Sequence, residues 1–365
     1  MRAAGTSLHL PAMSLLASGW LLLAMAPDRA WGQDPHAGMP GMDEARPALN
    51  IHGFSDVTYV ASGDSNLSRG FQLGQFVVHF SSSLARKASY FGEISGTPSA
   101  DKFNFEVERS FVRYDYNDGL KLSFGRYHTP IGYWNTAFHH GLWLQTTVRR
   151  PEQVRLGGIF VPVHFVGLKA EGDIPSGRAG LGYEVGVGNG RSEILSRGGD
   201  AGDVNTNRAW LVGLQAHPIV PLGLKAGATV YRDRLSLAAQ PAIDEWIVSG
   251  YAAWTREAPE LIAELITVRH RDHATGADFD SKGFYVQGAY RLPGRAHPAK
   301  LYARYEELDV PAGEPVFAFP DLQVVITGVR FDFLSLAAFK AEYRNELSPG
   351  RPRAHALFLQ TSYTF

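Results

Sequence analysis

Cysteine is absent from the 365 residues of this chain, which excludes disulfide bonds, thiolate nucleophiles and Cys-ligated zinc or iron–sulfur centres. An excess of charge is lacking too, because 35 Lys and Arg face 36 Asp and Glu and leave a net charge of −1. This balance argues against nucleic-acid binding through bulk charge. Long apolar runs are confined to the N-terminus, which argues against a bundle of membrane-spanning helices.

The N-terminal apolar run has the features of an export signal. Arg2 provides a positive charge, residues 14–26 are apolar, and residues 30–32 (Ala-Trp-Gly) fit the small-x-small pattern of a cleavage site. We expect residues 1–32 to be a cleaved signal peptide, with a retained membrane anchor as the alternative. Residues 33–49 are rich in Pro, Gly and Met, and we expect them to form a flexible segment.

From residue 50 onward, apolar and polar residues alternate with the period of two that is typical of β-strands. The alternation is clear at 120–124, 181–187 and 339–344. The pattern predicts about sixteen strands, within a range of about 14 to 18. The candidates are 51–61, 71–82, 88–97, 104–116, 119–127, 163–173, 179–189, 207–217, 222–232, 244–256, 259–270, 282–292, 299–308, 322–333, 336–346 and 354–365.

These strands favour an all-β fold, a transmembrane antiparallel β-barrel over residues 50–365. Each candidate has about the ten residues that cross a bilayer at a tilt, and short turns alternate with longer loops such as 190–206, 233–243, 271–281 and 309–321. A barrel in lipid turns its apolar face outward and its polar face toward an aqueous lumen. Residues expected on the lumen wall are Lys121, Lys169, Glu171, Arg304, Arg330, Lys340, Glu342 and Arg344.

The C-terminus alternates up to a terminal aromatic residue, Phe365. This ending resembles the closing strand of bacterial outer-membrane barrels, in which the barrel-assembly machinery reads the final aromatic residue. The resemblance implies a Gram-negative outer-membrane location, contact with outer-membrane lipid and assembly by that machinery.

One connection, residues 128–162, is much longer than the others and rich in Trp and Phe. A loop of this length and apolarity is typical of a functional segment, and we expect it to fold into the lumen as a constriction. In 16-stranded porins the third long loop takes this course, and here it is also the third. The residues expected to line the constriction or bind solute are Arg126, His128, Tyr133, Trp134, His139, His140, Trp143, Arg149, Arg150 and Arg155.

Residues 124–134 (Phe-Gly-Arg-Tyr-His-Thr-Pro-Ile-Gly-Tyr-Trp) resemble the strand-to-loop passage of the phosphate-selective porin O/P superfamily. The resemblance implies a passive channel for small hydrophilic solutes, often a homotrimer, without cofactors. Rows of Arg and Lys give phosphate-selective members their preference, whereas here Lys340 is followed by Glu342. We therefore expect only a weak anion preference, from the excess of Arg in the loop. The alternative role of these arginines is to pair with lumen carboxylates and stiffen the loop.

A substrate-specific channel is the second functional hypothesis. The rings of Tyr133, Trp134, Phe138 and Trp143 offer faces on which a sugar or an aromatic compound could stack. The simpler interpretation is that these rings anchor the loop to the barrel wall. A barrel with a plugged lumen, serving a structural or adhesive role, is a third hypothesis.

An outer-membrane hydrolase is the remaining alternative, suggested by the pairs His139-His140 and Asp272-His273. No G-x-S-x-G motif is present, so we do not expect an enzyme. His128 could join His139 and His140 around a metal. No H-E-x-x-H occurs, however, and no carboxylate stands at ligand spacing, so we expect no metal site.

Overall fold

The computed structural model describes residues 48–365, except 64–66, 156, 197, 204 and 238–240. The expected signal peptide (1–32) and residues 33–47 of the expected flexible segment lie outside the described residues. In the part of the chain that is described, no helix is long and apolar enough to cross a membrane.

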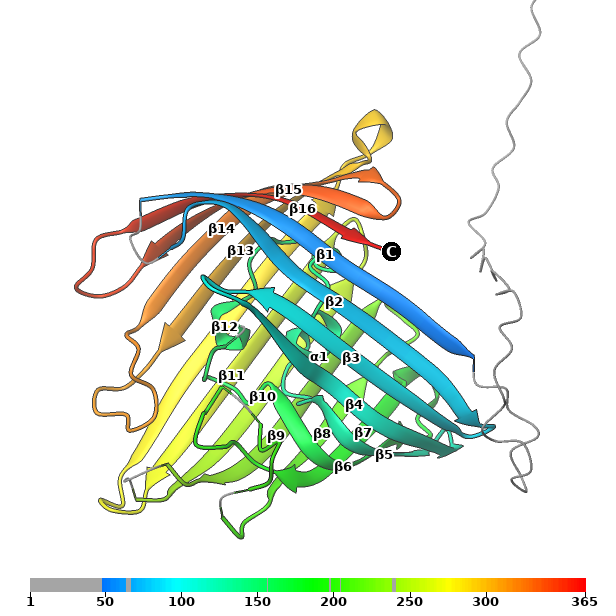
Figure 1. Cartoon of the computed structure of the whole chain (residues 1–365), viewed down its shortest axis with the longest axis vertical. Coiled ribbons are helices and arrows are strands. Elements are labelled where there is room, and N and C mark those ends of the chain that lie inside the picture. Colours follow the sequence, from blue (N-terminus) through cyan, green and yellow to red (C-terminus); the bar gives the residue numbers. More distant parts are fainter. Residues whose placement is uncertain (1–47, 64–66, 156, 197, 204, 238–240) are drawn as a thin grey trace, which may run out of the picture. The chain divides into compact units, whose positions relative to one another are not determined.

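Sixteen antiparallel strands, counted over the described residues, form one closed barrel in which each strand pairs with its neighbours in sequence and β1 pairs with β16 (Figure 1). The predicted number of strands is confirmed. The strands are β1 (Leu49–Ser62), β2 (Gly70–Ala85), β3 (Ala88–Pro98), β4 (Phe103–Asn117), β5 (Leu120–His128), β6 (His164–Asp173), β7 (Leu181–Asn189), β8 (Ala209–Ala216), β9 (Leu224–Leu235), β10 (Ile243–Thr255), β11 (Glu260–Asp272), β12 (Asp278–Arg291), β13 (Ala299–Asp309), β14 (Leu322–Leu334), β15 (Ala337–Leu347) and β16 (Ala354–Thr364). The helical turns are α1 (Trp134–Ala137), η1 (Glu152–Val154), η2 (Gly177–Ala179) and η3 (Gly294–Ala296).

The alternation of the sequence divides each strand between the two faces of the barrel. In β15, the side chains of Lys340 and Glu342 are fully buried, whereas Phe339 and Tyr343 beside them are 38% and 45% exposed. Because successive side chains of a strand point to opposite faces, the charges face inward and the rings face outward.

The last strand closes the barrel through the terminal residue. The backbone N–H of Gly53 donates to the carbonyl oxygen of Phe365 (2.7 Å), and the N–H of Phe365 donates to the carbonyl oxygen of Gly53 (3.0 Å). The ring of Phe365 lies on the outer surface, stacked on Phe76 with 6.0 Å between the ring centroids. The terminal aromatic residue is therefore part of the seam between β16 and β1.

Two predicted loops, 233–243 and 271–281, are shorter than expected because the strands beside them continue. Arg234 of β9 pairs with Asp244 of β10 (Nε–Oδ1 2.8 Å), and Arg269 of β11 pairs with Asp280 of β12 (Nε–Oδ1 2.7 Å). Opposite charges on facing positions stabilise a ladder, so these polar stretches extend the strands.

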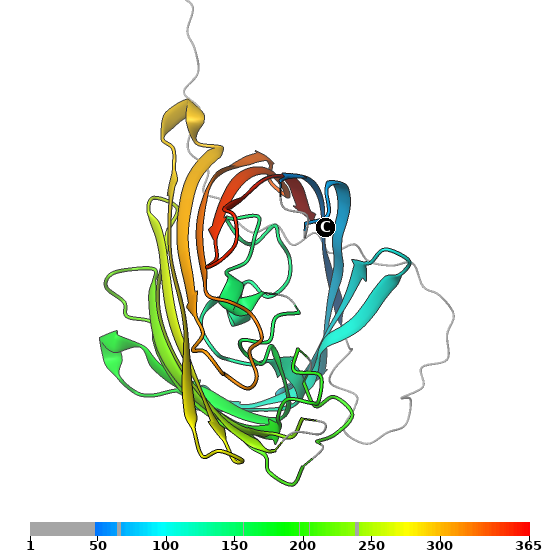
Figure 2. The same cartoon turned by 90° about the vertical axis from the view of Figure 1, so that its left-hand side faces the viewer.

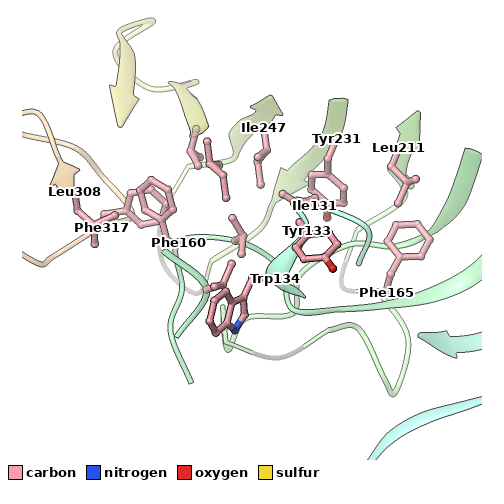
Figure 3. Close-up of a cluster of buried hydrophobic side chains, with 14 of the residues drawn as sticks. Ile131, Tyr133, Trp134, Phe160, Phe165, Leu211, Tyr231, Ile247, Leu308 and Phe317 are labelled. Atoms are coloured by element: carbon pink, nitrogen blue, oxygen red, sulfur yellow. The ribbon is translucent and has the colours of Figure 1, made fainter. Parts of the chain in front are cut away.

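The inner face is not polar all round, contrary to the expectation from the alternation. Strands β8–β11 turn Leu211, Tyr231, Ile247 and Ile262 inward, where they are buried in one apolar cluster with residues of the connection between β5 and β6 (Figure 3). Apolar side chains are stable on an inner wall when another segment covers them and excludes water. The largest hydrophobic core of the described residues thus lies inside the barrel.

Candidate functional site

The connection between β5 and β6, residues 129–163, lies inside the barrel and carries α1 and η1 (Figure 2). It has little regular structure, and its backbone N–H and C=O groups need partners where they are buried. Inward-facing side chains of β9, β11 and β13–β15 supply many of these partners. The first contact is made by Thr229 of β9, whose hydroxyl donates to the carbonyl oxygen of Pro130 (2.8 Å).

Wall carboxylates accept hydrogen bonds from the N–H groups of this loop. Three glutamates, on β11, β13 and β15, take part, and the N–H groups come from positions along most of the loop. The bonds run from Trp134 N to Glu264 Oε1 (2.6 Å), Val148 N to Glu342 Oε2 (2.7 Å), Arg149 N to Glu342 Oε1 (3.0 Å) and Glu152 N to Glu306 Oε2 (2.6 Å).

Wall cations donate to the carbonyl groups of the same loop. Lys340 donates to the carbonyls of Leu142 and Thr147, the latter at 3.1 Å. The remaining bonds run from Arg330 Nη1 to the carbonyl oxygens of Trp143 (2.7 Å) and Gln145 (3.0 Å), and from Arg304 Nη2 to that of Arg149 (2.8 Å). The mixed signs along the wall therefore match the two kinds of backbone group that the loop presents.

Not every predicted wall residue contacts the loop. Lys169 pairs with Glu171 (Nζ–Oε2 2.5 Å), which also pairs with Arg113 (Oε1–Nη1 2.9 Å), and Lys121 faces Glu171 across β5 and β6. This group lies toward the short turns that join β4 to β5 and β6 to β7. The structure keeps it separate from the constriction residues.

The loop aromatics pack against the wall. Trp134 is 0% exposed and meets Phe138 and Tyr285 edge to face, with centroids 5.0 and 5.9 Å apart, while the guanidinium of Arg304 lies 5.4 Å from its ring. Tyr133 is buried as well, and burial raises the pKa of its hydroxyl to about 12. No face of the Trp134 ring is open to a solute, so this arrangement favours anchoring over sugar stacking.

Trp143 is half-buried, and its ring lies 5.7 Å from the guanidinium of Arg330. Arg126, at the end of β5, pairs with Asp200 of the β7–β8 connection (Nε–Oδ1 2.8 Å). Arg126 stands on the same face of β5 as the exposed Leu122 and Phe124, so its side chain points away from the interior in which the loop lies.

Three arginines share one carboxylate in the loop. Glu152 pairs with Arg344 of β15 (3.0 Å), Arg155 (3.3 Å) and Arg149 (4.0 Å). Burial favours the neutral form of Glu152, but the three guanidinium groups outweigh it and hold the pKa of this carboxyl below its usual value. The arginine cluster is thus partly neutralised, and Arg155, with 56% of its side chain exposed, is its most accessible member.

Arg150 forms no ion pair with Glu152 or with any other carboxylate of the described residues. Its side chain is buried, Nη2 lies 3.5 Å from Nδ1 of His139, and Nε and Nη1 have no hydrogen-bond partner among the described residues. Burial lowers the pKa of Arg150 to about 10, so the group stays charged at neutral pH.

Four histidines meet beside Arg150. His128 ends β5, His164 begins β6 directly opposite it, and His139 and His140 belong to the loop. All four are buried, with the ring centroids of His128 and His139 3.6 Å apart and those of His139 and His164 5.2 Å apart. Burial, reinforced by neighbouring imidazoles and by Arg150, lowers the pKa of His139 well below its ordinary value.

Two carboxylates that no sequence spacing indicated lie beside these histidines. Glu93 of β3 lies 2.9 Å from His140 (Oε1–Nδ1), and Glu108 of β4 lies 2.8 Å from His164 (Oε2–Nε2). Both glutamates are inward residues of predicted strands, and the pairing of β3 with β4, β4 with β5 and β5 with β6 brings them beside this loop. Their inward position was the one available sequence signal.

No protein-family model matches the chain, and no curated protein is similar to it. Its structure is similar to that of the anion-selective porin from Comamonas acidovorans (TM-score 0.65, 12% identity, 88% of this chain and 100% of that chain covered). It is also similar to OmpT, an outer-membrane protein of Vibrio cholerae in a trimer form (0.59, 15%, 87% and 99%), and to the outer-membrane channel DcaP of Acinetobacter baumannii (0.60, 13%, 87% and 97%). The chain therefore has the fold of bacterial outer-membrane porin barrels.

Proposed function

We propose that this chain is a passive outer-membrane channel for small hydrophilic solutes, constricted by residues 128–162. The observation that carries the proposal is that inward charges of β11–β15 hold this loop inside a closed barrel. A charged inner wall stabilises hydrated solutes, and an inserted loop limits their size. The segment 124–134 supports a relationship to the phosphate-selective porin O/P superfamily.

The proposal includes a weak anion preference. Arg155 is 56% exposed, although it shares Glu152 with Arg149 and Arg344, so the constriction carries cationic charge that a solute can reach. The fold shared with an anion-selective porin supports the same direction.

Reversal potentials in a salt gradient across a planar bilayer test both parts of the proposal. We expect the purified protein to conduct and to favour anions, and Arg155→Glu to shift the reversal potential toward cation selectivity. Arg295→Glu, in the exposed turn between β12 and β13, is the matched control and should leave the potential unchanged. Absence of conductance would refute the channel, and cation selectivity of the unmodified protein would refute the preference.

We further propose export by a cleaved signal peptide at residues 1–32, insertion into the outer membrane by the barrel-assembly machinery through the strand ending at Phe365, and a homotrimer in the membrane. The trimer form of the Vibrio cholerae protein with the same fold supports the last point. N-terminal sequencing of protein from outer-membrane fractions and cross-linking in native membranes test these points. A mature protein that still begins at residue 1 would contradict cleavage of the signal peptide. A monomer as the only species after cross-linking would contradict the trimer.

A further inference from the structure

We infer that Glu93, Glu108, His128, His139, His140 and His164, here called the His–Glu cluster, bind a divalent transition-metal ion. The ion would fasten the constriction loop to strands β3–β6, opposite the wall that holds it through β11–β15. This inference goes beyond the proposed channel function, because it concerns a binding site and not the passage of solutes.

The first observation is the convergence of ligand atoms. Three sets of residues each bring one ligand atom per residue to within 4.8 Å of the others, a spacing that one ion can bridge. The sets share members, so they describe one compact site and not three. They are His128 with His139 and His164, Glu93 with His128 and His140, and Glu108 with His139 and His140.

The second observation is that ring nitrogens are buried without good hydrogen bonds. Nε2 of His139 has no partner among the described residues, and Nε2 of His128, Nε2 of His164 and both nitrogens of His140 face only carboxylate oxygens of Glu93 and Glu108. His140 Nδ1 lies 2.9 Å from Glu93 Oε1 but lacks the geometry of a hydrogen bond. Buried polar atoms without good partners are costly, and a cation bound by one nitrogen of each histidine would satisfy most of them together.

The third observation is an arrangement that orients His139. The amide nitrogen of Asn135 donates to the carbonyl oxygen of Thr129 (2.7 Å), so the amide oxygen is free to accept from Nδ1–H of His139 (3.0 Å). This bond places the proton on Nδ1 and leaves the lone pair of Nε2 available to a metal, and the 3.5 Å approach of Arg150 Nη2 to the same Nδ1 is then a close contact and not a hydrogen bond. Metal-binding histidines are commonly held by such a second hydrogen bond.

The donor set selects the class of ion. Imidazole nitrogens with carboxylates suit Zn²⁺ and its first-row neighbours, whereas Mg²⁺ and Ca²⁺ prefer oxygen ligands alone. The ligands are buried in the wall and the loop, as in closed structural sites. The rival account is a cluster of imidazole–carboxylate contacts that binds no metal.

Two arginines bear on the affinity. Arg109 donates to Glu93, and Arg150 lies 3.5 Å from His139, so two cations already offset the two carboxylates. A second positive charge close to a bound cation weakens binding. Arg150→Gln should therefore raise the metal affinity on the order of tenfold, which is the value of about 1.4 kcal/mol of repulsion removed. A purely structural role of the cluster predicts no such gain.

The test uses the full-length protein, folded in detergent, stripped with a chelator and titrated with Zn²⁺ by isothermal calorimetry, with Co²⁺ absorption as a second readout. We expect saturable Zn²⁺ binding that excess Mg²⁺ does not compete away. The double variant His139→Gln/His140→Gln should lose at least about 100-fold in affinity. The matched control His273→Gln/His297→Gln changes two exposed histidines and should bind as the unmodified protein does.

Heat-modifiable electrophoretic mobility shows whether each variant forms the barrel, and the single variant His139→Gln replaces the double variant if the latter does not fold. Absence of Zn²⁺ binding, or equal affinity in the folded ligand variants, overturns the inference. Bilayer conductance is measured independently, so failure of the metal site and failure of the channel are distinguishable.

Discussion

Glu342 on β15 accepts the backbone N–H of Val148 at 2.7 Å, although the two residues are 194 positions apart in the chain. The same carboxylate accepts the N–H of Arg149 (3.0 Å) and the hydroxyl of Tyr302 (3.1 Å). An inward glutamate thus supplies the loop with the hydrogen-bond acceptors that a neighbouring strand supplies within a sheet. The loop can lie inside the barrel without secondary structure because the wall replaces its missing hydrogen bonds.

Replacing this carboxylate should loosen the constriction. Glu342→Ala leaves the N–H groups of Val148 and Arg149 without their acceptor, at about 1–3 kcal/mol each. Lys340 and Arg304 still hold the loop, so we expect the barrel to form, with a larger and noisier single-channel conductance. Glu307→Ala, which removes a glutamate bonded to Tyr305 on the outer face, is the control. Identical conductance in the two variants would contradict this role of Glu342.

Gly125 should be intolerant of any side chain. Its φ of 141° is in a region that L-residues rarely adopt, and an added Cβ would lie 2.1 Å from the carbonyl oxygen of Ser110 on β4. Gly125→Ala must therefore push β5 and β4 apart just before the loop begins. We expect a cost of about 1–3 kcal/mol or more and a reduced yield of heat-resistant barrel on refolding.

Gly288→Ala on β12 is the matched control, because its Cβ would meet only Leu261 Cδ2 at 3.6 Å, an ordinary contact. Similar folding yields and thermal stabilities for Gly125→Ala and Gly288→Ala would rule out the steric argument.

Low pH should weaken the ion pair by which Glu152 of the loop is attached to Arg344 of the wall. Arginine neighbours lower the pKa of this carboxyl in the folded protein, so its ionised form contributes stability above the pKa of the unfolded chain, about 4.3. That contribution is lost as the pH falls through the depressed folded value. We expect current fluctuations to increase below about pH 4, and Glu152→Gln to show larger fluctuations already at neutral pH with a flatter acid response. An unchanged pH profile in Glu152→Gln would assign the acid response to another group.

Asn135 should act on metal binding without being a ligand. Asn135→Leu keeps the size of the side chain but removes the acceptor for Nδ1–H of His139, so we expect a loss of about 10- to 100-fold in Zn²⁺ affinity with the barrel intact. Asn345→Leu removes an amide that contacts an exposed histidine, His355, outside the cluster, and should have no effect. Equal affinities in the two variants would show that Asn135 does not orient a ligand.

The strands were predictable because their pattern is local. A side-chain period of two is a property of extended backbone, and the charges at Lys340 and Glu342 mark the inner face by their place in that period. The boundaries at Leu235 and Asp278 were less predictable, because they depend on ion pairs with residues of the adjacent strand.

The site was only partly predictable. The length and aromatic content of the loop identify it as unusual, and five of the eight wall residues that the alternation singled out contact it in the structure, namely Arg304, Arg330, Lys340, Glu342 and Arg344. No sequence spacing relates Glu264 to Trp134, or Glu93 to His140, because each pair joins a strand residue to a loop residue whose position is set by tertiary contacts.

By itself, the sequence determined an antiparallel barrel of about sixteen strands, from the alternation and from the short turns that place each strand beside the next. It also showed that the chain, without cysteine, has only His, Asp and Glu as strong metal ligands. Only the tertiary structure decided that His128 and His164 face each other and that Glu93 and Glu108 meet the loop histidines. The physical reason is that strand pairing and barrel closure together set which inward residues share the interior, and a loop without periodicity takes its course from those partners.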